Sequence, residues 1–157
     1  MSVGGRQWGL WLFEPFGLLW YFLVLDAGRS PKIFFVMARY EHLPIYKAAL
    51  DLTVHLEKLV AGFSRYHKYT LGTEMREGSR ALLMQILKAN DAPNAKQRCT
   101  ELLVLRNMVE ALLMTLRVAK EVKAFQSFQG YLFVIEQVGS VARQNEGWLT
   151  HTSQAKA

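Results

Sequence analysis

The sequence predicts an all-α protein, an antiparallel up-down-up-down four-helix bundle built from residues 37–149. Four stretches repeat apolar residues at steps of three and four, which is the spacing of one helix face. No stretch alternates apolar and polar residues as a β-strand would, and no proline falls inside the four stretches. Each helix has an apolar stripe to bury and the connections are short, so neighbouring helices are expected to pack antiparallel around one core.

The first helix is expected to begin at Pro44, because proline is tolerated in a first helical turn. Gly62 stands where a helix stop is expected. From the first turn onward, the apolar row steps by 4, 3, 4, 3 and 4 through Ile45, Ala49, Leu52, Leu56, Leu59 and Phe63.

The second helix has its apolar row at Leu71, Met75, Leu82 and Ile86, with Gly78 and Ser79 at the missing position. Its start is open between Ser64 and Thr73, because Gly72 suits either a boundary or a helix interior. The turn formers of residues 90–93, Asn-Asp-Ala-Pro, mark its end.

The third helix is expected to be the longest, from about Pro93 to Ala124. Its core row is Leu102, Leu105, Val109, Leu112, Leu116 and Ala119. A second apolar row comprises Val104, Met108, Ala111, Thr115, Val118 and Val122. One neighbour cannot cover a face that wide. The helix is therefore expected either to lie centrally in the bundle or to meet another subunit.

The fourth helix is expected to start after Ser127, a good N-cap residue. Its predicted core row is Tyr131, Ile135, Val138 and Ala142. Gly147-Trp148 is expected to end the ordered part of the chain, and residues 150–157 are predicted to form a disordered tail.

Residues 1–36 do not follow this pattern. The stretch from Trp8 to Leu25 is almost wholly apolar and reaches the lower length limit of a membrane-spanning helix, but Glu14 and Pro15 interrupt it. From Met37 the composition changes to that of a helical protein. We expect Met37 to be the initiator and residues 1–36 to be an apolar leader translated from upstream sequence. A membrane anchor and a genuine extension stay open as alternatives.

The charge balance points to an anionic partner. The chain has 19 basic and 13 acidic residues, with a sequence pI near 9.6. Nucleic acid and an anionic membrane surface are the two candidate partners, and a solubilising surface is the plain alternative. Cys99 is the only cysteine, so an intrachain disulfide is excluded and a cytoplasmic location is expected.

No catalytic pattern emerges from the residues. The four histidines, His42, His55, His67 and His151, are never three or four positions apart, and no Glu-x-x-His pair occurs. Glycine-rich phosphate loops and a Gly-x-Ser-x-Gly nucleophile turn are also absent. We therefore expect a binding protein, not an enzyme, without metal or cofactor.

The basic residues on the second and third helices form a candidate nucleic-acid surface, because cationic side chains neutralise phosphates. Its members are Arg76, Arg80, Arg106, Arg117, Lys120 and Lys123. The segment SRYHKYT adds Arg65 and Lys68 among aromatic residues that can stack on unpaired bases. Two alternatives stay open: the cations pair with nearby glutamates on an ordinary solvated face, and the tyrosines cap the core.

Four segments carry a family resemblance: LPIYKAALDL from Leu43, SRYHKYTLGTEMR from Ser64, LRVAKEVKAF from Leu116 and ARQNEGW from Ala142. In this order and spacing they resemble the bacterial four-helix-bundle family of the accessory variability determinant (Avd) of diversity-generating retroelements. Proteins encoded in intervening sequences of ribosomal RNA genes are relatives in that family. Residues 1–36 have no counterpart in the pattern.

The resemblance implies a homopentamer with a basic surface that associates with a reverse transcriptase and with its template RNA or cDNA during mutagenic retrohoming. It implies no catalytic residues, and it carries the basic character over onto the six candidate residues. The alternative within the same resemblance is a structural helical protein-interaction module of the ribosomal intervening-sequence type, without a retroelement role.

Overall fold

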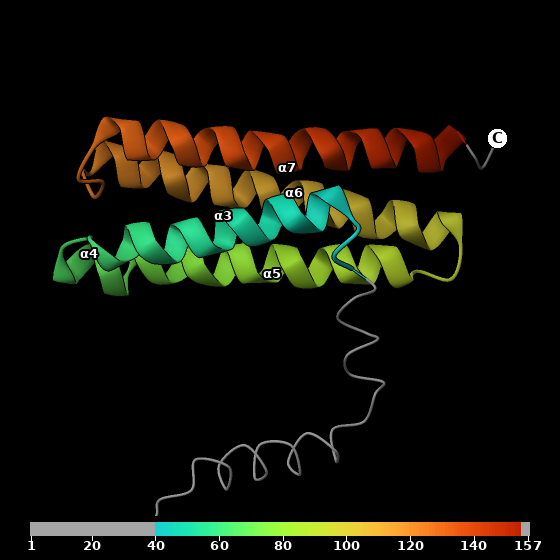
Figure 1. Cartoon of the computed structure of the whole chain (residues 1–157), viewed down its shortest axis with the longest axis horizontal. Coiled ribbons are helices and arrows are strands. Elements are labelled where there is room, and N and C mark those ends of the chain that lie inside the picture. Colours follow the sequence, from blue (N-terminus) through green and yellow to red (C-terminus); the bar gives the residue numbers. More distant parts are fainter. Residues whose placement is uncertain (1–39, 155–157) are drawn as a thin grey trace, which may run out of the picture. The chain divides into compact units, whose positions relative to one another are not determined.

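Four long amphipathic helices make up most of residues 40–154, the part of the chain that the computed structural model describes (Figure 1). They are α3 (Pro44–Ala61), α5 (Leu71–Asp91), α6 (Ala95–Glu121) and α7 (Phe128–Gln154), and the short α4 (Arg65–Tyr69) separates α3 from α5. Successive long helices run in opposite directions, so the predicted up-down-up-down bundle is confirmed. The predicted leader, residues 1–36, lies outside the described residues.

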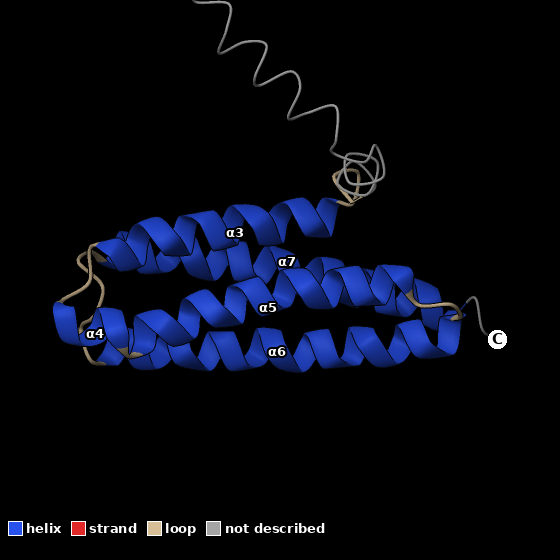
Figure 2. Ribbon diagram, turned by 90° about the horizontal axis from the view of Figure 1, so that it is seen from below, coloured by secondary structure: helices blue, strands red, loops and turns tan. Residues whose placement is uncertain are grey.

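The four long helices form a square in which each has two neighbours. Helix α5 packs against α3 and α6, and α7 packs against the same two helices, so α3 and α6 lie diagonally across the core (Figure 2). The largest fully buried side chains come from all four helices, among them Leu52, Met75, Leu105 and Val138. Burial of these stripes is the main stabilising contribution, at about 25 cal/mol per Å² of apolar surface.

The predicted core rows are confirmed most fully on α6, where all six residues from Leu102 to Ala119 are buried. On α3, Val60 is buried in place of Leu59, which is only partly covered. Of the row predicted for α7, Val138 is fully buried, but Tyr131, Ile135 and Ala142 are only partly buried. The helix is rotated from the predicted orientation, and its buried positions are Val134, Val138, Val141, Asn145 and Thr152. Valines fit this closely packed seam, while the larger Tyr131 and Ile135 lie at its edge.

Helix α7 also extends farther than predicted, since it continues past Gly147 and Trp148 to Gln154. Thr152 is buried and its hydroxyl donates to the Trp148 carbonyl at 2.8 Å, while Leu149 packs against the core. The disordered tail predicted from residue 150 is therefore wrong for residues 150–154. Core contacts hold this last turn although its sequence is mostly polar.

The ambiguous start of the second helix is resolved by two helices with a break between them. Ser64 caps the five-residue α4, and the backbone leaves helical geometry at Thr70 before α5 begins. Gly72 then lies against α3, where an added Cβ would approach Val60 Cγ1 to 2.4 Å. Glycine is needed at residue 72 because α3 and α5 approach each other so closely.

Helix α6 runs from Ala95, where Asn94 caps it, to Glu121, so it is shorter at both ends than predicted. Lys123 stops it by adopting a left-handed backbone, with φ of 57°. The amide of Lys123 donates to Lys120 O at 3.0 Å and that of Ala124 donates to Ala119 O at 2.9 Å, which is the Schellman pattern of a helix end. A lysine thus occupies the position that glycine usually takes. The predicted N-cap of α7 is confirmed, because Gly130 N donates to Ser127 Oγ at 3.1 Å.

Candidate nucleic-acid interface

Two of the predicted surface residues, Arg76 and Arg80 on α5, share one carboxylate from α3. Arg76 Nε lies 2.8 Å from Glu57 Oε2, and Arg80 pairs with the other oxygen of the same carboxylate. The three side chains together carry one net positive charge. Both arginines are therefore paired with a glutamate, as the alternative of an ordinary solvated face expects.

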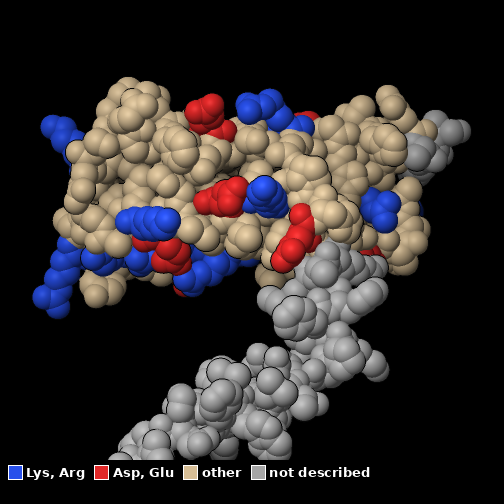
Figure 3. Space-filling view, viewed as in Figure 1, with Lys and Arg blue, Asp and Glu red and all other residues tan. Residues whose placement is uncertain are grey.

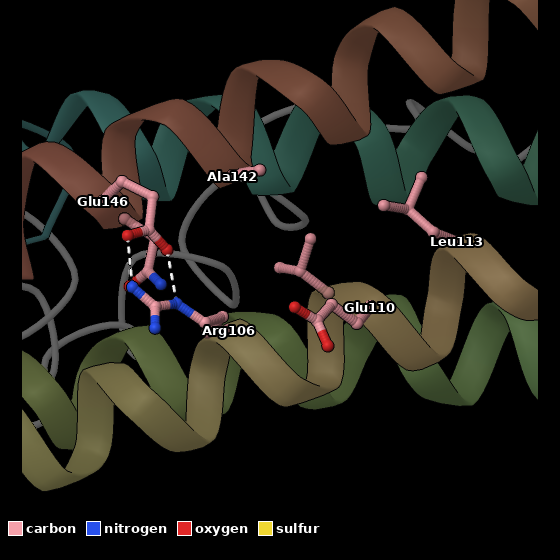
Figure 4. Close-up of a pocket in the computed structure, with 7 residues that line it drawn as sticks. Arg106, Glu110, Leu113, Ala142 and Glu146 are labelled. Carbon is pink, nitrogen blue, oxygen red and sulfur yellow. Dashed lines mark hydrogen bonds and ion pairs between the residues drawn. The ribbon is translucent and has the colours of Figure 1, made fainter.

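Arg106 is also paired, at the α6–α7 seam. Its guanidinium donates to both oxygens of Glu146 on α7, with the Nε bond at 2.6 Å (Figure 4). This hydrogen-bonded pair raises the pKa of Arg106 and lowers the pKa of Glu146. Arg106 is thus paired with a carboxylate of α7 and, unlike Arg117, is not an unpaired cation on α6.

A cavity of about 380 Å³ opens beside this ion pair, between α6 and α7. Glu110 and Leu113 line it from α6, and Ala142 and Asn145 line it from α7. Asn145 is buried and donates to the Leu102 carbonyl at 3.1 Å, while its Oδ1 has no protein partner among the described residues. The Asn145 amide therefore joins α6 and α7 by a buried hydrogen bond.

The last turns of α6 and the residues after it hold the other three predicted residues. Lys120 lies 3.1 Å from Glu121 and 5.8 Å from the Tyr131 ring centroid. Arg117 and Lys123 are exposed and make no ion pair with any described carboxylate. Arg117 contacts only the sulfur of Met114, at 3.9 Å, among the polar partners within residues 40–154.

The structure adds three cations that the six predicted residues did not include. Lys58, Arg65 and Lys68 lie at the same end of the bundle as Lys123, because α4 and the α6–α7 connection are neighbours there (Figure 1). Gln126 Nε2 donates to Gly62 O at 2.6 Å, and the Phe63 and Phe125 rings lie 5.3 Å apart, which joins the two connections. We call Lys58, Arg65, Lys68, Arg117 and Lys123 the α4-end cations.

These five residues make no ion pair within the described part of the chain. For Lys58, Arg65 and Lys68 the sequence itself indicates a lack of local carboxylate partners, since no acidic residue occurs between Lys58 and Thr73.

The net charge of the described bundle is concentrated in the half that contains α4. We define the α4 half as residues 52–80 and 112–137, which hold eight basic and five acidic residues. The rest of residues 40–154 hold six of each. Lysine and arginine side chains gather at and below the α4 end of the face in Figure 3, while the two signs alternate along the remainder. The bundle is therefore polarised along its long axis.

Two tyrosines of the same end are open to solvent. Tyr66 is 73% exposed and Tyr69 is 71% exposed, so the alternative that they cap the core is wrong. Phe63, Phe125 and Tyr131 cap it instead, with the Phe125 and Tyr131 ring centroids 5.5 Å apart. Large aromatic rings with this exposure are available to a partner.

Within residues 40–154, no three His, Cys, Asp or Glu side chains lie close enough together to hold a metal ion. No helix in the same range has both the length and the apolar composition needed to cross a membrane.

No protein-family model and no curated protein matches the chain. The resemblance to the Avd family therefore stays a prediction.

Proposed function

We propose that this bundle is a non-catalytic, nucleic-acid-binding accessory factor of a reverse transcriptase in a diversity-generating retroelement. The gathering of the α4-end cations without carboxylate partners is the observation that carries the binding part of this proposal. The retroelement context comes from the four resembling segments. Template RNA or its cDNA is the proposed nucleic acid, and the reverse transcriptase is the proposed protein partner.

Phosphate neutralisation by such cations releases counterions, so affinity is expected to fall steeply with salt. Cations already paired with a carboxylate contribute less, because binding a phosphate would leave that carboxylate unpaired. The α4-end cations are therefore expected to contribute more to affinity than Arg76, Arg80 and Arg106, although those three also belong to the predicted basic surface.

A charge-reversal series tests the binding proposal. The triple variant Lys58→Glu, Arg117→Glu and Lys123→Glu is compared with Lys47→Glu, Lys88→Glu and Lys96→Glu, which changes the net charge equally in the other half. Fluorescence anisotropy with a labelled 20-nucleotide RNA, and with DNA of the same sequence, measures Kd across a salt titration.

The first triple variant is expected to bind about tenfold or more weakly at moderate salt, and the second to stay within a few-fold of wild type. If the two triple variants lost equal affinity for RNA, net charge alone would determine binding, and the assignment of binding to the α4-end cations would be wrong. Circular dichroism verifies that both variants keep their helices.

Self-association is the second part of the proposal, and it rests on the outer face of α6. Three valines of the second apolar row are exposed in the single chain: Val104 is 41%, Val118 47% and Val122 45% exposed, whereas Met108 packs partly against the core. A homopentamer would bury such a row against another subunit. Sedimentation velocity of wild type and of a Val104→Ser, Val118→Ser double variant tests this, with a smaller species expected for the variant.

The exposed α6 row also supports a second candidate function, a structural protein-interaction module without nucleic acid. An oligomer that binds no RNA or DNA at low salt would favour that candidate. Copurification with a reverse transcriptase encoded beside this gene, next to a pair of near-identical repeats, would favour the retroelement role.

A further inference from the structure

Helix α4 presents two short rows of side chains with different chemistry. Tyr66 and Tyr69 are three residues apart and therefore neighbours on the helix surface, and Arg65 and Lys68 form a second pair at the same spacing. The tyrosines are more than two-thirds exposed, and Arg65 is exposed beside them. Aromatic rings and cations thus alternate along one turn and a half of helix.

The backbone beneath these side chains is well fixed. Lys68 N donates to Ser64 O at 2.8 Å, and the Thr70 hydroxyl donates to Tyr66 O at 2.9 Å. The Tyr66 ring meets the His67 ring edge to face, with the ring centroids 5.2 Å apart. Buried Phe63 anchors the residues before α4, and the close approach of Gly72 to Val60 fixes those after it. The exposed rings therefore stand on a preorganised platform.

Such a platform suits single-stranded nucleic acid. Bases in a duplex are stacked on one another and hide their faces, whereas unpaired bases offer them to aromatic side chains. We propose that Tyr66 and Tyr69 stack on two successive unpaired bases while Arg65 and Lys68 neutralise the phosphates beside them. This inference rests on the proposed nucleic-acid binding and specifies its substrate class and contact residues.

A protein partner is the rival occupant of exposed tyrosines, and the charges favour nucleic acid. The segment from Lys58 to Thr73 has three Lys or Arg residues and no Asp or Glu. The next carboxylate in the chain, Glu74, lines the groove between α5 and α6 with Gly78 and Met108. A polyanion with aromatic bases matches this surface in both charge and chemistry.

The test uses the full chain and fluorescent 20-nucleotide oligothymidylate, oligouridylate and a DNA duplex of equal length. Four double variants are compared: Tyr66→Ala with Tyr69→Ala, Tyr66→Phe with Tyr69→Phe, Arg65→Gln with Lys68→Gln, and the control Lys88→Gln with Lys96→Gln. Thermal unfolding verifies that each folds. The phenylalanine variant keeps both rings and serves as the matched control for the alanine variant.

The alanine pair is expected to weaken single-strand binding about 30-fold or more, since each base–aromatic stack contributes about 1–3 kcal/mol. Duplex binding should change less than about twofold, and the phenylalanine pair should stay within about threefold of wild type. The Arg65→Gln, Lys68→Gln pair should reduce the slope of log affinity against log salt by about 1.4, because each phosphate contact contributes about 0.7 on single strands.

Three outcomes would overturn this inference. If the Tyr66→Ala, Tyr69→Ala variant bound single strands as tightly as wild type does, the tyrosines would make no stacking contact. If the same variant lost equal affinity for single strands and for the duplex, the tyrosines would not distinguish unpaired from paired bases. Loss of self-association in sedimentation, with RNA binding unchanged, would place the tyrosines in a protein interface. Absence of any binding by wild type would instead refute the proposed function itself, and the two failures are therefore distinguishable.

Discussion

The two ends of the bundle use similar polar residues in different ways. At the turn between α5 and α6, Arg98 donates to the carbonyls of Ala89 and Ala92 at 3.2 and 3.4 Å, and the Gln85 amide donates to Glu101 at 2.7 Å. At the α4 end, Arg65 and Lys68 have no such partner within the described residues. The cation at the α5–α6 turn has hydrogen-bond partners within the protein and contributes to the fold. The cations at the α4 end have no such partners and are available to a ligand.

The largest effect is expected from Gly72→Ala, which attacks the packing that positions the α4 end. The new methyl group would meet the fully buried Val60 side chain at 2.4 Å and the His67 carbonyl oxygen at 3.1 Å. Overpacking of this kind costs about 1–3 kcal/mol. Urea unfolding should show that loss.

Gly147→Ala is the matched control for this prediction. No described residue comes within 4 Å of a Cβ added at Gly147, so alanine there should stabilise α7 by about 0.5–1 kcal/mol. If both glycine replacements stabilised the protein, the close α3–α5 approach would be wrong.

Arg98→Gln tests the opposite end. Loss of two carbonyl contacts at the end of α5 is expected to cost about 1 kcal/mol in unfolding free energy and to leave RNA affinity within about twofold. Arg65→Gln is expected to leave the free energy of unfolding unchanged and to weaken RNA binding. Chemical denaturation and anisotropy on the same samples compare them, and a loss of stability in both variants would erase the distinction between the two ends.

Lys123→Gly separates stability from binding at a single residue. The left-handed backbone of Lys123 costs an L-residue about 1–2 kcal/mol, and the greater chain freedom of glycine offsets part of the gain. We expect a net stabilisation of about 0.5 kcal/mol together with weaker RNA binding, because one α4-end cation is lost. A variant that binds RNA as well as wild type would remove Lys123 from that group.

The smallest effect concerns the titration of His55. Burial and then the neighbouring charge of Lys58 lower the pKa of this side chain, whose ring lies 4.7 Å from that of Phe133 on α7. Because the unfolded chain binds the proton more tightly, the contribution of His55 to stability is present above its ordinary pKa of about 6.5 and is lost as the pH falls toward its folded value. His55→Gln should flatten that part of the stability profile.

The same histidine reports on the ligand. Phosphate bound beside Lys58 would offset the positive charge there, so oligothymidylate should raise the pKa of His55 in an NMR titration. An unchanged pKa at saturating oligonucleotide would place the phosphates away from Lys58.

The predictable parts of this molecule are those set by local periodicity. The α6 core row follows from six residues on one stripe, and the start of α3 at Pro44 and the N-cap of α7 at Ser127 follow from local backbone chemistry. The orientation of α7 was mispredicted because Ile135 is as apolar as the valines and Tyr131 has a large apolar ring, and only packing against two neighbouring helices decides which side chains are buried.

The candidate surface was harder to predict for a related reason. Glu57 reaches Arg76 and Arg80 from another helix, and Glu146 reaches Arg106 across 40 positions of sequence, so no local spacing reveals these pairs. Arg65 and Lys68 were visible in the sequence, but their lack of carboxylate partners is a property of the folded bundle.

Asn145 has a consequence for how uniquely the chain folds. An amide that donates to Leu102 O in the α6–α7 seam adds little net stability, because its Oδ1 has no partner among the described residues. A one-turn slip of α7 along α6 would break that bond and bury the whole amide unsatisfied. We therefore expect Asn145 to fix the register of the two helices, so that Asn145→Leu yields a bundle of equal or greater stability with broader NMR lines from exchanging registers.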